Sequence, residues 1–343
     1  MNSPIIGIHH IPRSYSVPWI EYCEENNISY QKIDAFSSTL VQDCRGIDAF
    51  MCHWHHYDYS SWLVAKQIVA ALEFTGIYSF PNLSTFWHYD DKIAQKYLLE
   101  AVGAPTPNTW VFYDRDRAID WVLNDATFPI IFKLRRGSAS SNVKLIQNKQ
   151  EAEKLCNQAF NKGFISTPSY FYDFKQKTRK QYSLEMMLNK LKNMPKNFGK
   201  VLHIRKEFNR EKGYLYFQEF LPNNTYDTRV TVIGDRAFAV KRSNRPNDFR
   251  ASASGLLNYE NIDLELISVA FEVAKKAQLQ SAGFDFLYKK EKPVISEVSY
   301  TFPSKMVYNS PGYWGPNLSW HSGHVRPQYA IIEDLIDKVK SKR

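Results

Sequence analysis

The sequence has little cysteine and no long apolar run, and both absences narrow the class of protein. Its 343 residues include four cysteines, with no C-x-x-C spacing. A disulfide framework would therefore add little to a chain of this size. No segment approaches the roughly 18 uncharged apolar residues that a membrane span needs. The first residues lack the basic start and apolar core of a secretory signal, so we expect a soluble protein of the cytoplasm.

Charge is unevenly distributed along the chain. There are 44 Lys and Arg against 35 Asp and Glu, and the segment 173–212 alone holds twelve basic and four acidic residues. Such an excess suggests an anionic partner. Leu184, Met187, Leu188 and Leu191 form one helical stripe in this segment, which fits peripheral contact with an anionic membrane or packing on the protein itself. No RNA-binding or DNA-binding module accompanies the charge, so we expect no nucleic-acid partner.

Short apolar runs alternate with helical patterns over the first eighty residues. Strands are expected at 4–8, 28–33, 47–52 and 77–80, and helices at 17–26 and 59–74. This order predicts a parallel, doubly wound α/β domain over residues 1–104. Ligands of such sheets bind beyond the carboxyl ends of the strands. The residues there include His9, His10, His53, His55 and His56, which suit substrate contact, metal binding or ordinary packing.

The rest of the chain mixes helices with antiparallel strands, an α+β pattern. We expect one domain over 105–216, interrupted by the basic insertion 173–212, and another over 217–343. In the latter, Gly234 and Asp235 form a two-residue hairpin turn. A second hairpin turns within the sequence KKEK and ends before an aromatic tail.

The second hairpin carries the most specific pattern. An antiparallel pair turning about Glu291 places Asp285 directly across from Glu297, with Cβ atoms about 5 Å apart. Two such carboxylates call for a cation, and their oxygens suit Mg²⁺ that bridges substrate phosphates. The alternative is a pair of solvated acids on an exposed sheet face.

Two further positions suggest phosphate chemistry. In the hairpin about Gly234, Asp227 faces Arg242 and Arg229 lies on the same face, either as a structural salt bridge or as a cluster directed at nucleotide. Lys133 ends an apolar strand before a loop of small residues. A lysine in that setting can reach phosphate oxygens, although a surface turn is the commoner outcome.

Four segments occur in an order that is more specific than any one of them: 90–110, 128–145, 216–242 and 282–300. Together they resemble the ATP-grasp superfamily, nearest to the RimK and glutathione-synthetase-like carboxylate-amine ligases. The resemblance covers roughly residues 80 to 305. It implies an ATP-grasp fold in which the N-terminal doubly wound domain is the pre-ATP-grasp domain.

The resemblance implies ATP and Mg²⁺ as cofactors and assigns roles to residues. The residues implied to bind the nucleotide are Lys92, Lys133, Ser138, Gln218, Glu219, Leu221 and Asp227. The two lysines would contact phosphate, and Gln218, Glu219 and Leu221 would hold adenine. Arg229 and Arg242 would face the γ-phosphate and the acyl phosphate as catalytic residues. The implied metal ligands are Asp285, Glu297 and Ser299.

The sequence departs from the family at two places. Ala139, Ser140 and Ser141 occupy a loop that is usually richer in glycine. The metal motif has Ser299 where the family has asparagine, and a hydroxyl is a poorer ligand than an amide carbonyl.

The expected function is ATP-dependent joining of a carboxylate to an amine through an acyl phosphate. The tail 308–324 resembles ATP-grasp proteins of bacterial surface polysaccharide biosynthesis, which implies a sugar uronate as the acid. The alternatives are a catalytically weak nucleotide-binding scaffold and a basic membrane or nucleic-acid adaptor.

Overall fold

The computed structural model describes residues 3–55, 59–136, 142–165, 210–245, 248–251 and 255–342. Ser138, His56 and residues 173–209 of the basic insertion lie outside the described residues. The chain divides into two compact units. Unit 1 comprises Met1–Tyr89, Ala94–Thr106 and Asn223–Arg343, and unit 2 comprises Asp90–Ile93 and Pro107–Pro222. None of the described helices is long and apolar enough to cross a membrane.

Unit 1 begins with the expected parallel sheet. Its strand order is β2-β1-β3-β4, and every neighbouring pair is parallel. The strands are β1 (Ile6–Ile8), β2 (Tyr30–Lys32), β3 (Ala49–Met51) and β4 (Tyr78–Phe80). One face packs against α2 (Leu40–Asp43) and α3 (Tyr59–Phe74), where Phe50 and Leu72 are buried in one apolar cluster. The doubly wound domain is therefore confirmed, with α3 at its predicted bounds.

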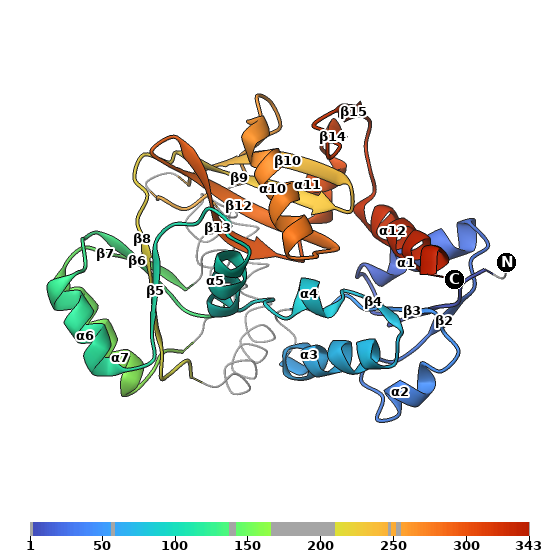
Figure 1. Cartoon of the computed structure of the whole chain (residues 1–343), viewed down its shortest axis with the longest axis horizontal. Coiled ribbons are helices and arrows are strands. Elements are labelled where there is room, and N and C mark those ends of the chain that lie inside the picture. Colours follow the sequence, from blue (N-terminus) through green and yellow to red (C-terminus); the bar gives the residue numbers. More distant parts are fainter. Residues whose placement is uncertain are drawn as a thin grey trace, which may run out of the picture. The chain divides into compact units, whose positions relative to one another are not determined.

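The other face of this sheet is covered from both ends of the sequence. Helix α1 (Ser16–Glu25) packs beside α12 (Pro327–Lys342), as Figure 1 shows. Trp19 of α1 and Ile332 of α12 are fully buried in the same cluster as Ile8 of β1. The aromatic tail thus ends in a helix that completes the core of the N-terminal domain.

A seven-stranded sheet forms the rest of unit 1, in the order β13-β12-β9-β10-β14-β15 with β11 paired to β10. The strands are β9 (Tyr226–Ile233), β10 (Arg236–Ser243), β11 (Leu257–Asn258), β12 (Ser281–Lys289), β13 (Lys292–Ser299), β14 (Gly312–Trp314) and β15 (Trp320–Ser322). Both predicted hairpin registers are confirmed: Asp227 pairs with Arg242, and Asp285 pairs with Glu297. The second register shifts by one residue just beyond Asp285, at a bulge.

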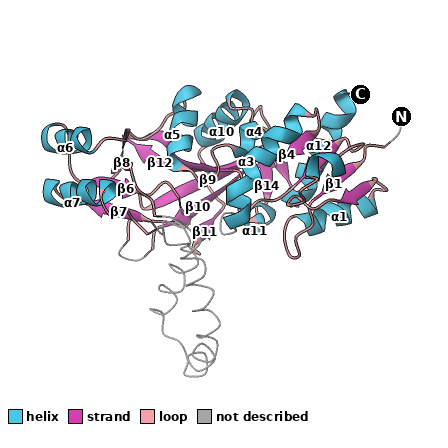
Figure 2. Cartoon of the chain, turned by 90° about the horizontal axis from the view of Figure 1, so that it is seen from below, coloured by secondary structure: helices cyan, strands magenta, loops and turns pink. Residues whose placement is uncertain are grey.

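Helices cover both sides of this sheet. Helix α10 (Leu264–Lys276) buries one face, where its Ala270 packs with Val230 and Phe284. The second half of α5 (Lys92–Ala101) adds Leu98 and Leu99 to that cluster. The shorter α11 (Ser304–Tyr308) contacts β10 from the opposite side, as Figure 2 shows. α4 (Leu83–Phe86) follows β4.

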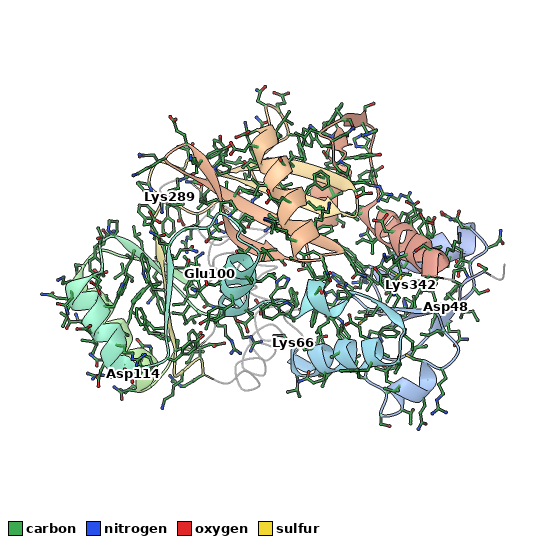
Figure 3. The ribbon with its side chains drawn as sticks, in the orientation of Figure 1. Asp48, Lys66, Glu100, Asp114, Lys289 and Lys342 are labelled. Carbon is green, nitrogen blue, oxygen red and sulfur yellow. The ribbon has the colours of Figure 1, made fainter. Side chains whose placement is uncertain are left out.

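Unit 2 is a four-stranded antiparallel sheet in the order β5-β8-β6-β7. Its strands are β5 (Thr109–Phe112), β6 (Ile130–Lys133), β7 (Val143–Ile146) and β8 (Leu215–Glu219). Helices α6 (Arg115–Asn124) and α7 (Lys149–Phe160) bury Phe132 and Phe217 on one face. Asp114, which Figure 3 labels, precedes α6. Its side chain caps the helix by accepting the Arg117 N–H at 2.9 Å. The polar residues of interest lie on the other face.

Candidate nucleotide and metal site

Four strands of unit 1 present charged residues on the sheet face opposite α10. Side chains alternate along a strand, so the apolar contacts of Val230 and Phe284 with α10 direct Arg229 and Asp285 to the other face. Arg229 pairs with Asp285 across β9 and β12, and Asp285 pairs with Glu297 across β12 and β13. A row of charges therefore crosses three adjacent strands. We call it the carboxylate face, and it also includes Asp227 and Arg242.

The carboxylate face holds a network of paired ions. Arg229 donates to both oxygens of Asp285, from Nε to Oδ1 at 2.6 Å and from Nη2 to Oδ2 at 2.8 Å. Arg242 makes the same two-pronged contact with Asp227, at 2.6 and 2.7 Å. Its Nη2 also lies 2.8 Å from Oδ2 of Asp285. Asp285 is only 4% exposed and Arg242 3%, so neither is a solvated surface charge. The salt bridge that the sequence offered as one interpretation of Asp227 and Arg242 is present.

The arginines fix the charge of Asp285. Burial by itself raises the pKa of this carboxyl, but attraction to Arg229 and Arg242 outweighs burial and holds the pKa below its ordinary value. Asp285 is therefore an anion near neutral pH. Two guanidinium groups keep that anion in one orientation.

The oxygen atoms of the carboxylate face are suitable ligands for a hard cation such as Mg²⁺. A carboxylate offers about four lone-pair positions, and the three guanidinium N–H contacts on Asp285 leave one on Oδ1. Glu297 is half-buried on the next strand, and Ser299 follows two residues later on the same face. The Ser299 hydroxyl contacts the Thr301 hydroxyl at 3.2 Å. Mg²⁺ takes oxygen ligands and usually keeps several waters, so two carboxylates and a hydroxyl are a suitable protein contribution.

Unit 2 carries the other residues that the sequence singles out. Lys133 pairs with Tyr216, and Gln218 pairs with Ile131, which places Lys133 and Gln218 on the face opposite α6 and α7. Lys133, Gln218 and Lys92 are all buried. The Lys92 main-chain N–H donates to the Arg135 carbonyl at 2.9 Å. This hydrogen bond connects Lys92 to the segment that follows Lys133, the other lysine predicted to contact phosphate.

The end of β8 is tied to β5. The Gln218 amide donates to the Thr109 hydroxyl at 3.1 Å. The Glu219 N–H donates to the Asn108 carbonyl at 2.8 Å, and its Oε2 accepts the Asn108 N–H at 3.1 Å. Leu221, two residues on, is buried. The segment predicted to hold adenine is thus fixed by both main-chain and side-chain contacts.

Two buried residues near the predicted site residues were not among the sequence predictions, Tyr214 and Arg245. The Tyr214 hydroxyl accepts the Arg135 N–H at 2.8 Å and donates to Glu211 at 2.9 Å, so it fixes the chain after Lys133. Arg245 is 8% exposed, three residues after Arg242. The basic spacing in KRSNR is the only sequence signal for Arg245, and nothing local distinguishes Tyr214, just before β8, from the other tyrosines of the chain.

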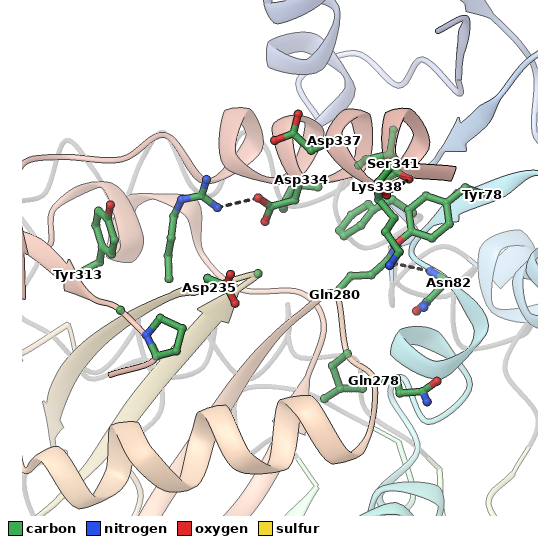
Figure 4. A pocket seen from close by; sticks show the side chains of 18 of the residues that line it. Tyr78, Asn82, Asp235, Gln278, Gln280, Tyr313, Asp334, Asp337, Lys338 and Ser341 are labelled. Carbon is green, nitrogen blue, oxygen red and sulfur yellow. Dashed lines mark hydrogen bonds and ion pairs between the residues drawn. The ribbon is translucent and has the colours of Figure 1, made fainter. Parts of the chain in front are cut away.

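A separate pocket of about 1320 Å³ lies in unit 1 (Figure 4). It is bounded by β4, the β9–β10 turn, the β14–β15 hairpin and α12. Arg236 donates to Asp334 there at 2.8 Å, and Gln280 accepts the Asn82 N–H at 2.7 Å. None of the site residues predicted from the sequence lines this pocket.

Comparison with known proteins agrees with this architecture. Residues 203–310 match the family model of the RimK-like ATP-grasp domain. A probable alpha-L-glutamate ligase 2 from Shewanella sp. (strain W3-18-1) is 30% identical over 133 residues, which is 38% of this chain and 41% of that protein. A probable alpha-L-glutamate ligase 2 from Shewanella baltica (strain OS155) is 35% identical over 92 residues, 26% of this chain and 31% of that protein. The matches thus span less than half of these curated relatives.

Solved structures match over the whole chain. A RimK domain ATP-grasp protein from Sphaerobacter thermophilus superposes with a TM-score of 0.58 and 12% identity, over 97% of this chain and 98% of that one. The D-alanine–D-alanine ligase of Bacillus anthracis gives 0.58 and 14% identity over the full length of both. The chain therefore has the ATP-grasp fold, and residues 203–310 are similar to the RimK-like ATP-grasp domain, as the resemblance implied.

Proposed function

We propose that this chain is an ATP-dependent carboxylate-amine ligase. The observation that carries the proposal is the carboxylate face, where an anionic Asp285 lies opposite Glu297 and is held by Arg229 and Arg242. A set of two carboxylates and two guanidinium groups, of which Asp285 and Arg242 are buried, suits the transfer of a charged phosphoryl group. The ligase names of the relatives and the ATP-grasp fold support the same reaction class.

The reaction has two steps. A substrate carboxylate oxygen attacks the γ-phosphorus of ATP, the bond to the β,γ-bridging oxygen breaks, and ADP leaves with the acyl phosphate formed. The amine then attacks the acyl carbon, phosphate leaves and the amine loses a proton, giving an amide. Arg229 and Arg242 would stabilise the charge on the transferred phosphoryl oxygens, which is positioning and electrostatics rather than covalent catalysis.

The remaining residues have binding roles in this proposal. Lys92 and Lys133 would neutralise nucleotide phosphates. Ser138 would also contact the nucleotide, and Asp227 would lie at its ribose or at the phosphate end. Gln218, Glu219 and Leu221 would hold adenine. Asp285, Glu297 and Ser299 would hold Mg²⁺, which, when bound, neutralises phosphate charge and orients it for displacement.

For the substrates, we propose a sugar uronate as the acid and an amino compound as the amine, in surface polysaccharide biosynthesis in the cytoplasm. The tail 308–324 supports this choice through its resemblance to such proteins. An acidic amino acid is the competing substrate, because the curated relatives are named glutamate ligases. We also propose peripheral membrane contact through 173–212, on the basis of its basic charge and its apolar helical stripe.

A second candidate function is a nucleotide-binding scaffold without turnover. Two observations favour it: Ser299 replaces the usual asparagine, and three guanidinium contacts already engage Asp285. Both would weaken metal binding without preventing the lysines from holding ATP. Both candidate functions therefore predict that the protein binds ATP, but only the ligase predicts that ADP forms.

Addition of Mg·ATP is expected to stabilise the protein. At a ligand concentration about a hundredfold above Kd, binding to the native state alone adds about 2.7 kcal/mol to the free energy of unfolding, which calorimetry or a thermal shift will detect. Lys133→Met should lose this stabilisation, because it removes a buried cation next to the predicted phosphates.

Lys144→Met is the matched control. Lys144 lies on the neighbouring strand β7 and is exposed, so its variant should respond to Mg·ATP like the wild type. Absence of any stabilisation of the wild type at millimolar Mg·ATP would remove both the ligase and the scaffold, and would leave the adaptor.

A further inference from the structure

A tyrosine and a glutamate of unit 2 hold the main chain beside both lysines that are predicted to contact phosphate. The Tyr214 hydroxyl accepts the Arg135 N–H at 2.8 Å and donates to Glu211 Oε2 at 2.9 Å. Arg135 lies two residues after Lys133, and its carbonyl accepts the Lys92 main-chain N–H at 2.9 Å. Both main-chain polar groups of residue 135 are therefore engaged, the N–H by Tyr214 and the carbonyl by Lys92.

The contact with Arg135 also supports the start of α5. Lys92 is the first residue of that helix, and the first N–H groups of a helix have no partner within it. The Arg135 carbonyl supplies one of these partners. The Arg135 Nε also lies 3.7 Å from Oδ2 of Asp91, the residue before the helix. The segments 91–92 and 133–135 are thus joined by a hydrogen bond and an ion pair, so a shift of one affects the other.

The glutamate behind Tyr214 is anchored to the core of unit 2. The main chain of Glu211 exchanges two hydrogen bonds with Phe164, at 2.8 and 2.9 Å. Phe164 is buried in the same apolar cluster as Phe132 and Phe217. The preceding Gly163 has a φ of +66°, and a Cβ there would lie 2.7 Å from the Glu211 carbonyl oxygen, so the close approach requires glycine. Glu211 is therefore a fixed acceptor for the tyrosine.

The direction of the Tyr214 hydrogen bonds follows from their partners. An amide N–H can only donate, so the Arg135 N–H must bond to the phenol oxygen, and the phenol hydrogen is left for Glu211. Burial and the charge of Glu211 both raise the pKa of Tyr214, so the hydroxyl keeps this hydrogen at neutral pH. The ring packs with Ile93 and Tyr216 in a small apolar cluster. The hydroxyl is thus held in one orientation as an acceptor.

We infer that Tyr214 is a positioning residue for the nucleotide phosphates and that Glu211 orients its hydroxyl. This inference rests on the proposed function, in which Lys92 and Lys133 neutralise those phosphates. By holding residue 135, Tyr214 keeps the main chain next to both lysines in the arrangement that binds the nucleotide. Without the hydroxyl, the cost of ordering these segments is transferred to the binding step.

Tyr214→Phe removes the acceptor of the Arg135 N–H and keeps the ring beside Ile93 and Tyr216. Calorimetric titration of the full chain with Mg·ATP should give a Kd about threefold to tenfold higher than that of the wild type. This is the factor that the loss of one hydrogen bond produces.

A second variant separates affinity from stability. Tyr214→Phe also deprives the buried Glu211 carboxylate of its hydroxyl donor, which destabilises the protein. Adding Glu211→Met replaces that carboxylate by an apolar side chain of similar size and should recover most of the stability. The Kd for Mg·ATP should stay raised in the double variant, because the Arg135 N–H still has no phenol acceptor. A purely structural role of Tyr214 predicts that the affinity recovers together with the stability.

Tyr288→Phe is the matched control. The Tyr288 hydroxyl also donates to a carboxylate, that of Asp263 at 2.8 Å, at the start of α10 in unit 1. Loss of this hydrogen bond should leave the Kd for Mg·ATP within about twofold of the wild type.

Wild-type affinity in the double variant, or an equal loss of affinity in Tyr288→Phe, would overturn the inference. Failure of the proposed function has a different signature, because the wild type itself would then show no binding of Mg·ATP. That result would remove the inference together with the function on which it rests.

Discussion

Replacement of Asp285 by asparagine is expected to lower ADP formation by about a hundredfold or more. The substitution keeps the shape of the side chain and removes the charge that the arginines hold in place. Glu297→Gln should cause a loss of similar size, because both carboxylates are proposed to hold the same cation. Initial rates of ADP release at saturating Mg·ATP measure both effects.

A control in the same hairpin separates metal binding from general damage. Glu291 is exposed at the turn between β12 and β13, so Glu291→Gln should retain the full rate. Glu297 is half-buried, and its neutral isostere should change the free energy of unfolding by less than about 0.5 kcal/mol. If stable Glu297→Gln and Asp285→Asn proteins both kept near-normal rates, the metal assignment would be wrong.

Arg242→Met should lower the free energy of unfolding by about 3–5 kcal/mol. The guanidinium contacts both Asp227 and Asp285. Its removal leaves these two buried carboxylates with Arg229, which is paired to Asp285, as a neighbour of opposite charge. Denaturant unfolding at neutral pH measures the loss. Arg236→Met, on the same strand but at a more exposed pair with Asp334, should cost about 1 kcal/mol or less. Equal losses in the two variants would contradict a special role for the buried network.

The two buried carboxylates of this network affect the pH dependence of stability with opposite signs: burial raises the pKa of Asp227 despite Arg242, whereas Arg229 and Arg242 lower the pKa of Asp285. The pKa of Asp285 in the folded protein lies below that of an unfolded aspartate, which is about 3.9. Its contribution is therefore complete above that unfolded value and is lost as the pH falls towards the folded one. As the pH is lowered from about 5 to about 2, the free energy of unfolding of Asp285→Asn should fall by less than that of the wild type. The variant is less stable than the wild type at pH 5.

Local patterns were sufficient for most elements and for the hairpin registers. The helix at α3 and the opposition of Asp285 and Glu297 depend on short-range periodicity and on a tight turn, and both were predictable. The bulge after Asp285 was not, because it shifts one strand without changing the alternation that the sequence displays.

Contacts between segments that are distant in the sequence could not be predicted from local patterns. The pairing of Arg229 with Asp285 depends on β9 and β12 being neighbours, which no local signal fixes. The packing of α12 on the N-terminal sheet likewise joins the two ends of the chain. The five strand-end histidines looked alike in the sequence, and the Ala35 contact, which the structure shows for His9, could not be predicted from it.

The acyl phosphate is the central claim, and hydroxylamine tests it most directly. The protein is incubated with Mg·ATP, hydroxylamine and each acid of a panel of uronic acids and acidic amino acids, and hydroxamate, ADP and AMP are quantified. With an acid that the site accepts, the account predicts hydroxamate and ADP in equal amounts and no AMP, with both products lost in Asp285→Asn. AMP with pyrophosphate, or ADP that forms without hydroxamate, would contradict it.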